Sequence, residues 1–235
     1  MNRSLKIAGL AAGAMLGGAV ASSAAVIDFT DDDTVGGTSA YDTRTPSSAT
    51  GSTMLGGTGI TWEIVPGPAG EFLTYAHGPA PGSIGILEGD NDGIGVNYVS
   101  GAEIADPEEY ITITFSQAIR VTGLYFLNLF QKADGSGGES VDIFLGDTPG
   151  ADGTGILNLL AKVPYETESG YGDFEGLSLV GKTFTFTPGA GTDAVFLKDF
   201  SLAAIEVQAV PLPAGVLLLG SALGGLGFAR RLRKS

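Results

Sequence analysis

The stretch Tyr110-Ile111-Thr112-Ile113-Thr114-Phe115 indicates most clearly which class of fold this chain adopts. After Tyr110, its residues alternate between large apolar side chains and threonine. Successive side chains of an extended strand point to opposite faces, so Ile111, Ile113 and Phe115 share one face and the threonines share the other. The stretch is therefore predicted to be a β-strand with one face in a core.

A second stretch, Thr183-Phe184-Thr185-Phe186-Thr187, repeats the alternation and is followed by the turn residues Pro188-Gly189. Other alternating or apolar segments predict further strands at 26–29, 60–65, 72–76, 94–99, 121–130, 141–145, 156–163, 195–200 and 202–207. Glycine, aspartate and proline clusters separate these segments. Many short strands joined by such turns predict an all-β fold, an antiparallel β-sandwich of jelly-roll type. We expect its core to contain Ile111, Ile113, Phe115, Phe184 and Phe186.

The predicted β-sandwich ectodomain covers residues 26–209 and is counted as one domain. Within it, residues 30–59 are rich in threonine, serine, glycine and aspartate, and we expect them to form a loosely ordered excursion. The chain contains no cysteine. The domain must therefore be held together by burial alone or by burial together with a metal ion.

The predicted domain is strongly acidic. All 26 acidic residues of the chain lie between Asp28 and Glu206, where only six basic residues occur, so this part carries a net charge of −20. Such a charge repels nucleic acid and anionic lipid headgroups, and it attracts divalent cations. Nucleic-acid binding is therefore excluded as a function.

Residues 1–25 have the composition and order of a secretory signal peptide. Arg3 and Lys6 form a positive start, residues 7–21 are uncharged and apolar, and Ser22-Ser23-Ala24-Ala25 supplies small residues for signal peptidase. We expect cleavage after Ala24 or Ala25. The alternative, a buried helix at 7–21, is disfavoured because glycine and alanine make a poor core.

The last 26 residues form a second terminal segment. Val210, Pro211, Leu212, Pro213 and Ala214 begin an uncharged stretch, 210–229, that spans about 30 Å as a helix, the thickness of a bilayer core. A basic tail, 230–234, follows this stretch and would hold the end of the chain on the cytoplasmic side. The pattern predicts a single transmembrane helix at 210–229 with a stop formed by Arg230, Arg231, Arg233 and Lys234.

This tail resembles the PEP-CTERM type of sorting signal, in particular its VPLPA variant. The resemblance covers only the tail and rests on the order of the Val210–Ala214 motif, the apolar helix and the basic cluster. It implies recognition by an exosortase-type transpeptidase of a Gram-negative bacterium. The precursor would be anchored in the inner membrane and the product would reach the cell surface or the extracellular matrix.

Leu212 stands where the Pro-Glu-Pro form of the signal has its acidic residue. This departure leaves open which sorting enzyme acts and where it cuts. The alternative is a type I membrane anchor that is never processed.

One internal stretch suggests metal binding. Glu88, Asp90 and Asp92 gather around glycines, and Glu103 and Asp106 precede the strand at 110–115. Oxygen ligands from an acidic, glycine-containing loop are those that Ca²⁺ prefers, although the spacing is not that of an EF-hand. Acidic turns of this kind are also common as solvated connections without metal. Both interpretations stay open, and no other cofactor is predicted.

The residues of familiar catalytic sites are scarce. His77 is the only histidine, no Gly-x-Ser-x-Gly elbow occurs, and without cysteine there is no thiol nucleophile. Trp62, the only tryptophan, alternates with Ile60 and Ile64, which favours burial in the core over a surface platform for sugar.

Three classes of function remain. The first is a non-enzymatic surface or matrix protein, with exopolysaccharide as its candidate partner. The second is a calcium-stabilised carbohydrate-binding or adhesion module. The third is a polysaccharide hydrolase or lyase, for which two suitably placed carboxylates suffice. We expect the first class, and no enzymatic activity.

Overall fold

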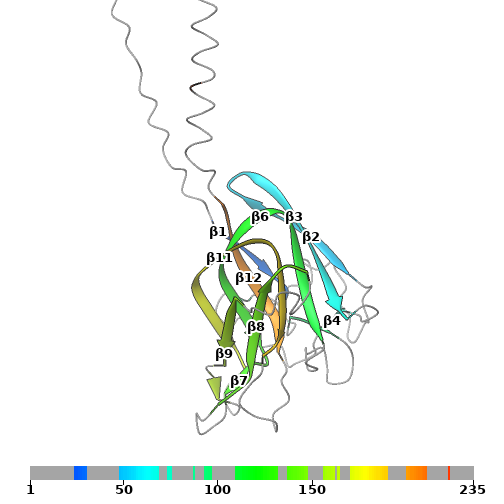
Figure 1. Cartoon of the computed structure of the whole chain (residues 1–235), viewed down its shortest axis with the longest axis vertical. Coiled ribbons are helices and arrows are strands. Elements are labelled where there is room, and N and C mark those ends of the chain that lie inside the picture. Colours follow the sequence, from blue (N-terminus) through cyan, green and yellow to red (C-terminus); the bar gives the residue numbers. More distant parts are fainter. Residues whose placement is uncertain are drawn as a thin grey trace, which may run out of the picture.

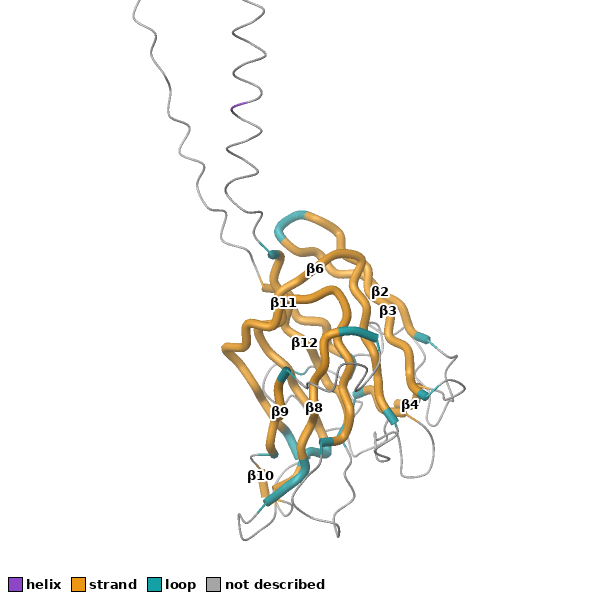
Figure 2. Tube along the Cα trace, viewed as in Figure 1, coloured by secondary structure: helices purple, strands orange, loops and turns teal. Residues whose placement is uncertain are grey.

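The computed structural model describes residues 24–30, 48–68, 73–75, 87, 93–96, 109–131, 137–147, 156–161, 163–164, 170–189, 200–210 and 222. Within these ranges every regular element is a β-strand, apart from the single helical residue Ala222 (Figure 2). All strand pairs but one run antiparallel. The all-β class predicted from the alternation is therefore confirmed.

The strands of the described part are numbered in their order along the chain (Figure 1). They are β1 (Ala24–Asp28), β2 (Ala49–Leu55), β3 (Thr58–Gly67), β4 (Leu73–Tyr75), β5 (Ile94–Val96), β6 (Tyr110–Leu127), β7 (Phe130–Gln131), β8 (Ser140–Leu145), β9 (Leu157–Leu160), β10 (Val163–Pro164), β11 (Gly172–Pro188) and β12 (Ser201–Ala209). β7 and β10 form a small parallel pair, and the other strands belong to one sheet.

The two longest strands, β6 and β11, organise this sheet. They pair with each other along most of their lengths, with shifts of register between Glu175 and Leu179 and between Gly181 and Thr183. β3 pairs with the first part of β6 and β12 pairs with its second part. β8 lies beside the end of β11, and β9 beside β8. Bulges bend strands and increase their twist, which lets the two parts of the sheet pack on a common core.

The five side chains that the alternation assigns to the core are all buried in one cluster: Ile111, Ile113, Phe115, Phe184 and Phe186. The rings of Phe115 and Phe184 meet edge to face at 6.3 Å. Phe126, from the second part of β6, makes edge-to-face contacts with Phe186 and with Phe200. Both parts of β6 thus face the same core in a sandwich-like packing.

Strand β2 lies within residues 30–59, for which the sequence predicts a loosely ordered excursion. It pairs in continuous register with β3 through the two-residue turn Gly56-Gly57. Both glycines have positive φ, 56° and 83°, as a type I′ hairpin turn requires. The prediction therefore does not hold for residues 49–59. The prediction failed there because β2 has little apolar alternation in its sequence, since Leu55 is its only fully buried residue.

Strand β1 begins inside the predicted signal-peptidase site. Ala24 pairs with Gln208 and Ala25 pairs with Val207, and Ala25 also packs against the core. The sheet thus begins two residues before residue 26, the expected start of the ectodomain. The start of β1 therefore lies beside the end of β12 in the sheet.

No helix among the described residues has the length and apolar character needed to cross a membrane. The predicted transmembrane helix, 210–229, lies outside the described residues except for Val210 and Ala222. Residues 1–23 of the predicted signal peptide also lie outside them, as do Pro211, Leu212, Pro213, Ala214, Arg230, Arg231, Arg233 and Lys234.

Candidate functional site

An open groove with a volume of about 530 Å³ crosses strands β2, β3, β6 and β11. Most of the side chains that line the groove carry a hydroxyl group, and one carboxylate and one ammonium group complete the polar lining. The lining residues are Thr50, Gly51, Ser52, Thr61, Trp62, Glu63, Thr114, Phe115, Ser116 and Lys182.

The strand register explains why these polar side chains gather. Residues directly opposite each other on neighbouring antiparallel strands project to the same face. Glu63 of β3 stands opposite Thr50 of β2 on one side and Thr114 of β6 on the other, and Thr114 stands opposite Thr183 of β11. Four strands therefore place one polar row on the outer face. A second row begins with Ser52 opposite Thr61.

The inner side of the groove is an apolar support. Trp62 is 3% exposed and meets Phe29 edge to face at 5.6 Å, so its predicted burial in the core is confirmed. A Cβ at Gly51 would lie 2.2 Å from Cζ2 of the indole, so only glycine leaves room for the ring beneath β2. In the described part of the chain, the indole Nε1 has no hydrogen-bond partner. Trp62 therefore supports the groove from the core side and offers no stacking surface.

Hydroxyl pairs connect β6 and β11 beside the groove. The Oγ1 atoms of Thr112 and Thr185 lie 2.9 Å apart, and those of Thr114 and Thr183 lie 3.3 Å apart. Thr185 also donates to the carbonyl of Gly146 at 2.6 Å. Thr112 and Thr185 are buried, whereas Thr114 is half-buried and lines the groove. The open part of the polar face is therefore the part around Thr114.

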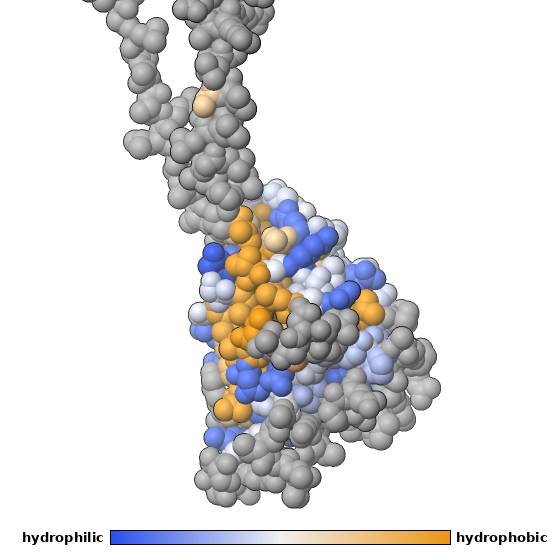
Figure 3. All heavy atoms as spheres, viewed as in Figure 1, coloured by the Kyte–Doolittle hydropathy of each residue, from blue (hydrophilic) through white to orange (hydrophobic). Residues whose placement is uncertain are grey.

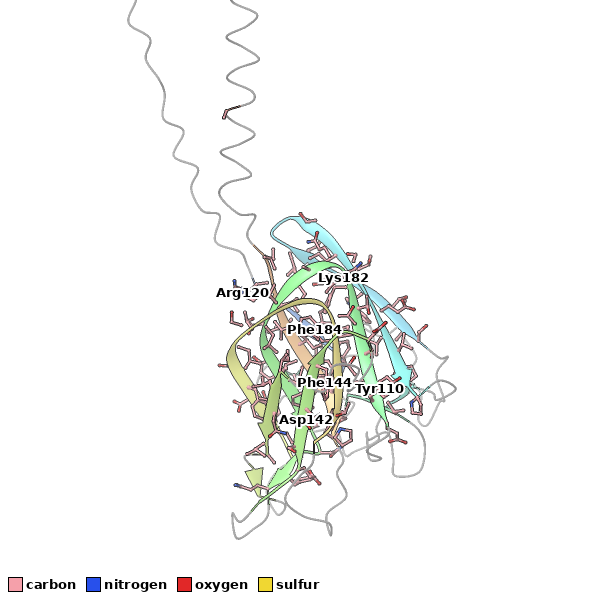
Figure 4. The ribbon with its side chains drawn as sticks, in the orientation of Figure 1. Tyr110, Arg120, Asp142, Phe144, Lys182 and Phe184 are labelled. Atoms are coloured by element: carbon pink, nitrogen blue, oxygen red, sulfur yellow. The ribbon has the colours of Figure 1, made fainter. Side chains whose placement is uncertain are left out.

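The charged groups of the groove come from different strands. Glu63 is an exposed residue of β3, and Lys182 is an exposed residue of β11 near the β2–β3 hairpin (Figure 4). A carboxylate accepts hydrogen bonds, an ammonium group donates them, and hydroxyls do both. The lining therefore suits a ligand that carries many hydroxyl groups.

A second polar cluster centres on Gly123 of β6. Glu175 of β11 and Glu206 of β12 stand opposite this glycine on its two sides. A Cβ at Gly123 would lie 2.9 Å from the hydroxyl of Tyr125 and 3.0 Å from Oε2 of Glu206. The Tyr125 hydroxyl donates to Oε1 of Glu175 at 3.3 Å. Two carboxylates and one phenol therefore converge over a position without a side chain.

The environment of Tyr125 keeps its hydroxyl protonated. Burial raises the pKa of Tyr125 above its ordinary value, and the negative charges of Glu175 and Glu206 raise it further. The ring of Tyr171 stacks on that of Tyr125 at 6.4 Å. Sequence reasoning missed this cluster because its members are far apart in the chain. Only the pairing of β6 with β11 and β12 brings them together.

The predicted calcium ligands Glu88, Asp90, Asp92, Glu103 and Asp106 lie outside the described residues. Two residues that flank the first three are described. Leu87 is fully buried, and Gly93 has a φ of 91° with the position of its Cβ only 2.5 Å from the carbonyl oxygen of Leu202. Among the residues that the structure does describe, no group of three or more acidic, histidine or cysteine side chains is arranged to hold a metal ion.

Comparisons with protein-family models, with curated proteins and with solved structures find no match to this chain.

Proposed function

We propose that this chain is an exported, non-enzymatic protein of the cell surface or extracellular matrix, and that its groove binds exopolysaccharide. The observation that carries the proposal is the lining of the groove by hydroxyls from β2, β3 and β6, with Glu63 and Lys182 as its charged groups. Its volume lies within the range of about 300–1,000 Å³ that is usual for ligand sites. Its polar lining favours a hydroxylated ligand over an apolar one.

The charge of the domain narrows the class of glycan. With a net charge of −20 between Asp28 and Glu206, the domain repels polyanions. Among the described residues that line the groove, Lys182 is the only cation, and Glu63 offsets its charge. A neutral polysaccharide segment is therefore the ligand that the site fits best.

The proposal includes the route by which the protein reaches the surface. A signal peptide would be removed by signal peptidase, a helix at 210–229 would anchor the precursor, and an exosortase-type enzyme would recognise Val210–Ala214. The start of β1 lies beside the end of β12. This supports the route, because both terminal segments would then meet the membrane at the same side of the domain. We also propose that the strands of the sandwich are connected in the order of a jelly roll.

A glycan array probed with the full chain in detergent tests the ligand. We expect binding to a neutral glycan, weakened about 5- to 30-fold by Glu63→Gln or Thr114→Val, since the first weakens and the second removes a polar contact worth about 1–2 kcal/mol. Asp147→Asn, an exposed change outside the groove lining, is the matched control. Binding that is equal in all variants, or absent from the wild type, would contradict the proposal.

The same array with and without calcium tests the alternative of a calcium-stabilised carbohydrate-binding or adhesion module. Binding that is lost on addition of EDTA would favour this second class. Binding that is unchanged by EDTA would favour the groove alone.

The cluster at Gly123 supports a second candidate function, hydrolysis of a polysaccharide. Glycosidases act through two carboxylates that lie roughly 5–10 Å apart. Glu175 of β11 and Glu206 of β12 flank Gly123 from the two strands on either side of β6. Release of reducing ends from a polysaccharide panel, abolished by Glu206→Gln, would establish this candidate, whereas the groove proposal expects no release.

A further inference from the structure

Strand β9 lies at one edge of the main sheet, beside β8 (Figure 1). Among the described residues, no strand pairs with its other side. An edge strand presents a row of N–H and C=O groups that another strand can pair with, and proteins usually protect such edges with charges, proline or bulges. Residues 156–161, Ile-Leu-Asn-Leu-Leu-Ala, contain neither a charge nor a proline.

Apolar side chains are exposed along this edge. Ile156 is 39% exposed and Leu160 is 57% exposed, and the exposed Asn158 lies between them on the same face. Apolar residues gather in a band over the part of the molecule where β9 and β11 are labelled (Figure 3). In a domain with a net charge of −20, an edge without carboxylates is a place where two copies can approach each other.

We propose that β9 pairs with β9 of a second copy of this chain, antiparallel and about a two-fold axis at Asn158. In this register the exposed Ile156 faces Leu160 of the second copy, and Leu157 faces Leu159 on the inner side. The sequence Ile156-Leu157-Asn158-Leu159-Leu160 reads almost the same in both directions. The strand is therefore complementary to itself, as an isologous two-fold interface requires.

The charges behind the edge allow this approach. Asp142 of β8 stands opposite Asn158 and accepts a hydrogen bond from its amide. In the paired sheet, the two Asp142 side chains would be three strand spacings apart, roughly 14 Å. This separation exceeds the Debye length of about 8 Å at physiological ionic strength, so their repulsion is largely screened.

The pairing also has a consequence for the groove. A two-fold axis perpendicular to the sheet keeps the outer faces of both copies on the same side. The two grooves would open in one direction, and, if the proposed glycan binding holds, one long polysaccharide could engage both with a gain in avidity. The pairing itself does not depend on glycan binding.

Disulfide trapping in the purified full chain, kept in detergent, tests the pairing. The natural chain has no cysteine, so a single introduced cysteine gives an unambiguous readout. Directly opposed residues of an antiparallel pair have Cα atoms about 4.5–5.5 Å apart, which a disulfide can span. We therefore expect Asn158→Cys to form a covalent dimer under mild oxidation. Met54→Cys, exposed on the β2–β3 hairpin, should not.

Two further variants test the register. Ile156→Cys and Leu160→Cys should each crosslink poorly alone, because equivalent residues would lie about 13 Å apart along the strands. Co-expressed, they should form a mixed dimer. Leu160→Glu in the Asn158→Cys background should sharply reduce the dimer, since it places a charge in the apolar contact. An Asn158→Cys dimer no stronger than that of Met54→Cys, or one that Leu160→Glu leaves unchanged, would overturn the proposal.

Discussion

Gly51 shows how one residue without a side chain shapes the groove from beneath. The indole of Trp62 occupies the space where a Cβ of residue 51 would stand, and β2 can therefore lie directly on the ring. Gly59, on β3, has a different environment, because its Cβ would meet only Sδ of Met54 at 3.7 Å. Gly51 and Gly59, on the two strands of one hairpin, thus have unequal roles.

We expect Gly51→Ala to lower the free energy of unfolding by about 1–3 kcal/mol, the usual cost of overpacking a core. Gly59→Ala, the matched control, should have little effect. In a Trp62→Phe background the additional cost of Gly51→Ala should shrink, because the smaller ring leaves space for the methyl group. Urea denaturation of the four variants measures this coupling, and equal costs for the two glycine substitutions would contradict it.

The phenylalanines of the alternating strands test the core. Phe115→Ala or Phe184→Ala should cost about 3–5 kcal/mol, because each removes a fully buried ring. Thr50→Ala, at an exposed position of the groove, should change the stability by less than about 0.5 kcal/mol. Similar losses at Phe115 and at Thr50 would show that the inner face is wrongly assigned.

Thr112 lies on the face of β6 that the alternation directs away from the core, so Thr112→Ala should cost far less than Phe115→Ala. The residue is nevertheless buried, and its hydroxyl meets that of Thr185. We expect a loss of about 0.5–1.5 kcal/mol, the net value of one hydrogen bond, measured by urea denaturation. Alternation identified the face of Thr112 but carried no information on what covers that face.

Whole elements were predictable to different degrees. The alternation located the first part of β6 and the end of β11, but it missed residues 172–182 of β11. Gly176 has a φ of 71° there, and the register shifts between Glu175 and Leu179. A bulge inserts an extra residue and breaks the two-residue period, so the pattern fades although the strand continues.

The acidic stretch at 88–106 carries the calcium prediction. Glu88, Asp90 and Asp92, with Glu103 or Asp106, would repel one another unless a cation intervenes. A site with a dissociation constant on the order of 10⁻⁴ M would, at tenfold excess of calcium, add about 1.4 kcal/mol of stability. Melting curves with calcium and then with EDTA measure this effect. Asp90→Asn combined with Asp92→Asn should abolish the effect of calcium. If chelation does not change the melting temperature of the wild type, the stretch is a solvated turn that binds no calcium.

At the scale of the whole molecule, the prediction of where the protein is located rests on its tail. Because the Val210–Ala214 motif, the apolar stretch and the basic cluster follow the order of a sorting signal, we expect the mature protein to lack Arg230–Lys234. Intact-mass measurement of surface protein checks this expectation. Replacing Pro211 and Pro213 by alanine should cause the uncleaved form to accumulate. A wild-type protein that keeps its basic tail would instead be a plain membrane anchor.

The sequence by itself determined the all-β class, the inner faces of the two alternating strands and the burial of Trp62. These follow from side-chain periodicity, which is a local property of the chain. Only the tertiary structure decided that Thr50, Glu63 and Thr114 line one groove, and that Glu175 and Glu206 meet over Gly123. These residues become neighbours through the pairing of strands distant in sequence. A period of two fixes which way a side chain points, but it does not fix which strand lies beside it.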